Sequence, residues 1–180
     1  MGKKVNAWLG LGSAVILAAH VCYQVVAYAA FYYNEFVTAL LGHILSVLVI
    51  LHVLCSLSLL IFSHDKGMGI KYGALNIRII LQRVTALLML VLIGVHVNTF
   101  KHLADAMVPI LIVQILFFAC VFVHIGASVT NALITRGVID SMKARKKIDI
   151  AVFIICIVLF IAASVVITKT DIMLVKEGMV

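Results

Sequence analysis

Histidines are the residues of this chain that could do chemistry, because five of the seven lie in long apolar segments and four of these fall one on each of four segments. These four are His20, His52, His96 and His124. An ionisable side chain is costly in hydrocarbon and marks a functional site there by default, although a lone histidine can also hydrogen-bond between membrane helices. One histidine on each of four segments favours a functional site that the segments share.

Helical depth sorts these histidines into two pairs. Measured from the nearest cation on the side of the membrane that holds the N-terminus, His20 and His96 lie about 24 and 27 Å along their helices. His52 and His124 lie about 21 and 18 Å along theirs. A neutral imidazole nitrogen is an axial ligand of haem iron, and two of them can hold one iron from both sides. The two pairs therefore predict two haem b groups, between which electrons can pass across the membrane.

His43 shares a segment with His52, nine residues away, and matches neither depth pair. At about 100° per residue this spacing puts the two on opposite faces of a helix. Ser56 and Ser63 share the face of His52, which favours that face as the interior. We predict that His43 is structural, while its replacing His52 as a ligand stays open.

Polar side chains follow each of the four histidines along the same helix face. They are Asn6 and Ser13 with His20, Ser56 and Ser63 with His52, Arg78, Gln82 and Thr85 with His96, and Ser128, Asn131 and Thr135 with His124. A buried guanidinium needs an anionic partner, and no acidic residue is expected inside a membrane segment. Arg78 and Gln82 are therefore predicted to bind the propionates of the haem nearer the N-terminal side.

Three further residues complete this predicted cofactor lining. Ser128 and Asn131 share the face of His124, and Arg83 lies about one turn deeper in the membrane than Arg78 but at an angle off its face. The alternative, that both arginines reach lipid phosphates instead, stays open.

Composition places the chain in a membrane. Hydrophobic residues make up 65% of its 180 residues and charged residues 12%, against about a half and about a quarter in soluble domains. Five segments have the roughly 20 apolar residues that a spanning helix needs. They are 7–32, 36–63, 76–100, 106–135 and 148–168. We expect an all-α integral membrane protein with a single domain, residues 1–180, whose first segment is a retained span and whose first four helices form the haem-binding bundle.

The basic residues predict how the chain is oriented. With the N-terminus inside, eleven Lys and Arg residues fall on the inner side and three on the outer side. The positive-inside rule then places the N-terminus in the cytoplasm and the C-terminus outside. The basic inner face suits anionic lipid or an acidic partner subunit, rather than nucleic acid.

Four stretches carry a resemblance to a known family. In chain order they are "GLGSAVILAAHV", "VLVILHVLCSLSLL", "LQRVTALLMLVLIGVH" and "FVHIGASVTNALITRG". Their order and topology resemble the five-helix, dihaem cytochrome b subunit of succinate dehydrogenase and quinol:fumarate reductase, whose fifth span is bare. Two positions depart from the family pattern: Ala86 replaces a glycine, and Phe122 replaces a glutamate of a proton path, so we do not expect that path here.

The resemblance implies the rest of the function. His52 and His124 would hold the inner haem, and His20 and His96 the outer one. A flavoprotein subunit and an iron–sulfur subunit would dock on the cytoplasmic face of a bacterial or archaeal-type inner membrane. The chain would be the quinone-reactive electron-transfer subunit of a succinate:quinone oxidoreductase, with menaquinone or ubiquinone as its partner; dimerisation of the complex is left open.

A quinone site needs a group that exchanges protons, and such groups are expected only at the membrane edges. On the outer side these are Glu35 and Asp105, and the resemblance favours Glu35, which follows Tyr32, Tyr33 and Asn34. An inner site is the alternative. It would lie near Asn6, Ser13 and Lys71.

Two other functions stay open from the sequence. One is the haem b subunit of another respiratory complex, such as a hydrogenase, formate dehydrogenase or nitrate reductase. The other is a haem-free membrane transport or assembly protein.

Overall fold

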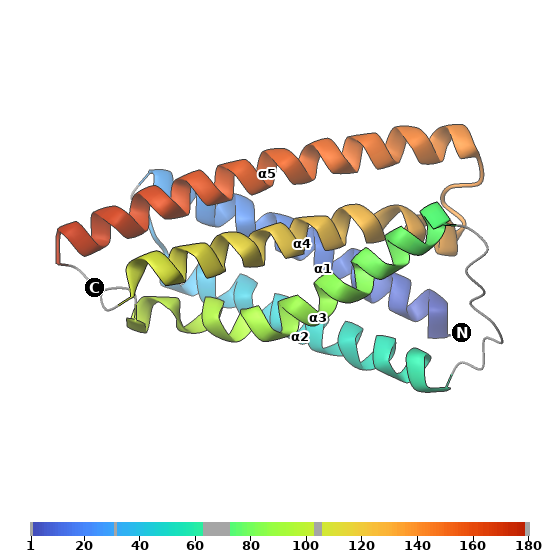
Figure 1. Ribbon diagram of the computed structural model, residues 1–180, viewed down its shortest axis with the longest axis horizontal. Coiled ribbons are helices and arrows are strands. Elements are labelled where there is room, and N and C mark those ends of the chain that lie inside the picture. Colours follow the sequence, from blue (N-terminus) through green and yellow to red (C-terminus); the bar gives the residue numbers. More distant parts are fainter. Residues whose placement is uncertain (1, 31, 63–72, 103–105, 179–180) are drawn as a thin grey trace.

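A computed structural model of the chain describes residues 2–30, 32–62, 73–102 and 106–178 (Figure 1). These residues form five long helices and no strand. The helices are α1 (Gly2–Ala29), α2 (Glu35–Phe62), α3 (Gly73–His102), α4 (Met107–Arg136) and α5 (Met142–Lys176). Each is long and apolar enough to cross a membrane. The predicted all-helical architecture with five apolar helices is confirmed.

The helices begin and end where the sequence offers caps. The Asn34 side chain accepts a hydrogen bond from the Val37 amide at 3.1 Å and so begins α2. Ser141 caps α5 in the same way, accepting from the Ala144 amide at 3.2 Å. α4 ends at Gly137, whose φ of 76° is a left-handed conformation that glycine adopts without strain.

The fifth helix is longer than the sequence predicts. It was expected over residues 148–168, but the structure extends it in both directions, to Met142 and to Lys176. α5 therefore contains two acids, Asp149 and Asp171. The expectation that no acidic residue lies inside a span is wrong: Asp149 falls even within the predicted segment, and Asp171 is brought in by the continued helix.

Two helices, α1 and α4, form the centre of the bundle. α1 packs against α2, α4 and α5, while α4 packs against α3, α1 and α5. Within the described parts of the chain, no Cα atom of α2 comes within 8 Å of one of α3 or α4, and none of α1 does so with α3. The first four helices thus form an open row, α2–α1–α4–α3, and α5 lies along α4 and α1 (Figure 1).

Most large apolar side chains point outward, as expected of helices whose solvent is lipid. Val91 and Val97 on α3 are 68% and 73% exposed, and Ile61 on α2 is 71% exposed. The buried apolar side chains are fewer and lie mainly on α4, which has three helix neighbours.

Candidate functional site

His124 of α4 is held by the facing helix α3. Its Nδ1 lies 3.0 Å from the backbone oxygen of Gln82 and 3.2 Å from the hydroxyl of Thr85. Thr85 donates to its own helix, at the Leu81 oxygen. This geometry suits an Nδ1–H donor, which fixes the ring orientation and leaves the lone pair on Nε2 for a metal.

His52 of α2 is seated on a glycine of α1. A Cβ atom added at Gly10 would lie 3.1 Å from Cε1 of the imidazole. Any side chain at this position would therefore force the ring to move. One turn further along α2, Ser56 donates to the Asn6 side chain at 2.9 Å. Both residues belong to the polar faces predicted for these two helices, and the structure brings those faces together.

His96 of α3 is fixed by aromatic contacts with α4. Its ring stacks on Phe117 with centroids 4.9 Å apart, and Phe118 meets it edge-on at 5.9 Å. Aromatic neighbours of this kind fix the plane of a ring without using its nitrogens.

The structure brings the four histidines together as two pairs. His96 interacts electrostatically with His20, and His124 with His52. The first pair joins α3 with α1 and the second joins α4 with α2, although neither of these helix pairs comes into backbone contact. Each pair therefore links two helices whose Cα atoms stay more than 8 Å apart.

Three of these imidazoles have a nitrogen that the protein leaves unbonded. The Nδ1 atoms of His20, His52 and His96 are buried without a hydrogen-bond partner. The His52 imidazole also interacts with the backbone of Asn6 on α1, so it links two helices as well. His43, by contrast, is exposed, and its Nδ1 lies 2.6 Å from the Ala39 oxygen of its own helix.

These features fit an axially ligated cofactor better than a metal held by protein alone. Among the residues that the structure describes, no cluster of three or more His, Cys, Asp or Glu side chains could hold an ion. Ligation by two histidines needs a group that supplies the remaining ligands itself, as a haem macrocycle does. The two histidine pairs and the Nδ1 contact that orients His124 suit such a group.

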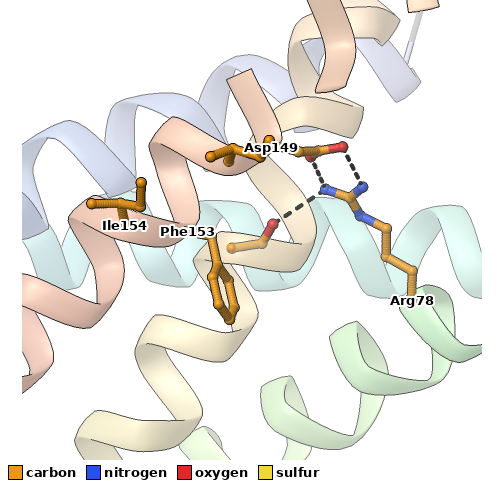
Figure 2. Close-up of a pocket in the computed structure, with 6 residues that line it drawn as sticks. Arg78, Asp149, Phe153 and Ile154 are labelled. Atoms are coloured by element: carbon orange, nitrogen blue, oxygen red, sulfur yellow. Dashed lines mark hydrogen bonds and ion pairs between the residues drawn. The ribbon is translucent and has the colours of Figure 1, made fainter. Parts of the chain in front are cut away.

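Arg78 has a different partner from the predicted propionate. Figure 2 shows its guanidinium pairing with both oxygens of Asp149, at 2.7 and 3.2 Å. It also donates to the backbone oxygens of Ala127 and Gly126, at 2.7 and 3.2 Å. The long side chain reaches past α4 to α5, beside exposed apolar residues that include Phe153. Asp149 supplies the anionic partner that a buried guanidinium needs, so this need alone does not assign Arg78 to a haem propionate.

The remaining predicted lining residues lie at the contact of α3 with α4. Gln82 donates to the Ser128 hydroxyl at 2.8 Å, while Asn131 bonds to its own helix at the Ala127 oxygen. Arg83 is exposed. Gln82 therefore contacts α4 twice: its side chain donates to Ser128, and its backbone oxygen lies 3.0 Å from His124 Nδ1.

The predicted outer quinone site lies at the exposed start of α2. Glu35 is the first residue of that helix and is exposed, as are Tyr32 and Tyr33. An acid at this position interacts favourably with the helix dipole, which by itself accounts for it. Asp105, Lys71 and Ser63 lie outside the described residues.

Three buried polar residues were missed by the sequence analysis. Gln114, Thr130 and Asp171 have exposures of 2%, 0% and 0%. Gln114 is a polar residue within an apolar run, and this signal could have identified it. Asp171 follows Lys169, beyond the predicted segment 148–168, so no signal marked it as buried.

Comparison of the chain with known protein families, with curated proteins and with solved structures gives no match.

Proposed function

We propose that this chain is a dihaem cytochrome b: a membrane subunit that anchors a succinate dehydrogenase or fumarate reductase complex and carries electrons between its iron–sulfur subunit and a membrane quinone. The observation that supports the proposal is that His96 interacts with His20 and His124 with His52, each pair coming from two helices whose Cα atoms stay more than 8 Å apart. His52 with His124 and His20 with His96 would each hold one haem b.

Haem supplies one-electron transfer when it is bound, and the residues of the chain supply its position. Gln82 orients His124 through a backbone oxygen, Gly10 leaves room for His52, and Phe117 fixes the plane of His96. The His52–His124 pair lies nearer the end of the bundle that holds the N-terminus, and the His20–His96 pair nearer the opposite end. In the proposed orientation these are the cytoplasmic and outer ends.

The docking face is proposed from charge. The basic residues of the N-terminal end include Arg136, which lies 4.6 Å above the ring of Trp8, and Arg145, which is 3.8 Å from Asp149. A net charge of +7 with most of the cations at this end suits acidic soluble subunits.

Purification of the intact complex from native membranes tests the proposal. We expect a flavoprotein and an iron–sulfur subunit to co-purify with the chain, and succinate or a quinol to reduce its haems. Co-purification of hydrogenase, formate dehydrogenase or nitrate reductase subunits would support the alternative respiratory role. A preparation without haem would contradict both.

A further inference from the structure

A fully buried acid and amide face each other between α5 and α4, near the ends of these helices that lie away from the N-terminus. Asp171 is 0% exposed and Gln114 is 2% exposed. The Gln114 Nε2 donates to Asp171 Oδ2 at 3.3 Å. This pair is separate from the histidines and from the Arg78–Asp149 ion pair.

One oxygen of each side chain has no partner. Asp171 Oδ1 and Gln114 Oε1 are both buried, and neither makes a hydrogen bond. With an ionised carboxylate, two acceptors would remain in the membrane without a donor, which is a costly arrangement. A proton on Asp171 Oδ1 changes this, because the resulting hydroxyl can donate to the amide oxygen. The two side chains then form a ring of two hydrogen bonds, and both unpartnered oxygens are satisfied.

The charged surroundings of Asp171 also favour a neutral acid. The titratable group that faces it from α1 is Tyr28, which interacts with it electrostatically and carries no positive charge. From α4 it meets the uncharged Gln114. On α5 itself Lys169 is exposed, and no cation within the described parts of the chain forms an ion pair with Asp171. Asp149 differs, because two arginines lie beside it.

The acid–amide pair lies close to one of the histidine pairs. Gln114 precedes Phe117 by three residues, so the two lie about one turn apart on the same side of α4. Phe117 is the residue that stacks on His96. A proton held by Asp171 is therefore about one helical turn away from the ring that covers His96.

We propose that Asp171 is a neutral carboxylic acid closed onto Gln114, and that it donates and accepts the proton in quinone chemistry at this end of the bundle. In quinone reduction, the electrons come from the iron–sulfur partner. Because Asp171 is 0% exposed, the acid–amide ring must open before a quinone oxygen reaches it. The O–H bond at Asp171 Oδ1 then breaks, and its proton forms a new O–H bond on a quinone oxygen that has gained an electron. The carboxylate then takes a proton from water at this end. Quinol oxidation runs the same steps in reverse. The quinone part rests on the proposed function; the protonation state does not.

Infrared difference spectroscopy of the purified complex at neutral pH tests the protonation state. We expect a carbonyl band of a protonated carboxylic acid that the Asp171→Asn variant loses. Asp149→Asn is the matched control, because it removes the other aspartate of the same helix and should leave the band in place. Lack of a band assignable to Asp171 would overturn the proposal, whether or not the protein holds haem.

The thermal midpoint tests the hydrogen-bonded ring of Asp171 and Gln114, and quinone-linked turnover tests the proton transfer. Asparagine has the donor and acceptor of the neutral acid, so Asp171→Asn should keep the thermal midpoint and haem content, whereas Asp171→Leu should lower the midpoint. Quinone-linked turnover of Asp171→Asn should fall about a hundredfold, while reduction of the protein by artificial donors stays unchanged. A strongly lowered midpoint in Asp171→Asn would mean that the acid is ionised. Unchanged turnover with a neutral acid would refute the proton-transfer role.

Discussion

At the residue scale, the polar atoms of the helices differ in whether the protein gives them a hydrogen-bond partner. Ser13, Ser46 and Ser58 donate back to their own helices, as hydroxyls commonly do in membrane helices. The Nδ1 atoms of His20 and His52 are buried and bond to nothing. The buried hydroxyl of Ser164 also lacks a partner, so the pairing of the histidines, rather than this feature, marks them as candidate ligands.

Replacing the two histidines of α2 separates ligand from structural residue. His52→Ala should remove one of two haems, because it removes an axial ligand. His43→Ala is the matched control on the same helix and should leave the absorption spectrum unchanged, since His43 is exposed and bonds only to Ala39. Both spectra are measured as reduced-minus-oxidised differences; a lost haem in His43→Ala alone would show that the wrong histidine was chosen.

The Arg78–Asp149 pair is predicted to stabilise the bundle. The two side chains are 20% and 30% exposed, so their interaction is intermediate between a surface and a buried ion pair. Asp149→Asn should lower the free energy of unfolding by about 1–3 kcal/mol, because Arg78 loses its anion. Thermal melts of the protein in lipid bilayers check this. Midpoint potentials of both haems that shift only in Arg78→Gln, and not in Asp149→Asn, would instead support a propionate role for Arg78.

At the element scale, α1 and α2 pack closely enough for His52 to depend on Gly10. Helical periodicity predicted the polar faces of these helices, but it could not show that the His52 ring covers a glycine. Periodicity gives the angle of a residue on its own helix and does not identify the helix that lies opposite. For the same reason, the contact of Arg78 with α5 could not be predicted.

Adding one methyl group to α1 tests this contact. In Gly10→Ala the new Cβ would lie 3.1 Å from the imidazole, so the ring must move by a few tenths of an ångström. We expect a shifted midpoint potential or spectrum for one haem only. Gly12→Ala is the matched control, because nothing lies within 4 Å of a Cβ there. Equal effects of the two substitutions would refute a specific role for Gly10.

At the scale of the whole molecule, apolar length and turn residues were sufficient to predict five helices, because lipid allows few other structures to span it. The helix ends were less predictable. Charged residues near the end of the fifth segment indicated a boundary, yet Asp171 continues the helix because Gln114 of α4 offers it a buried partner. The two histidine pairs were predicted from depth along the helices, and their role as haem ligands stays a prediction.

Orientation is a separate prediction for the whole chain. A single cysteine placed at Glu177, in a background without the four native cysteines, should react with a membrane-impermeant thiol reagent from outside intact cells. A cysteine at Lys143 should react only after the membrane is opened. The opposite labelling pattern would reverse the inner and outer assignments of both haems.

The measurement that tests the central claim most directly is the haem content of the purified chain by the pyridine haemochrome assay. We predict two haem b groups per polypeptide, both low-spin as expected for ligation by two histidines, and a loss of one group in each of the variants His52→Ala and His96→Ala. A stoichiometry of one or none, or two haems that persist in these variants, would contradict the assignment.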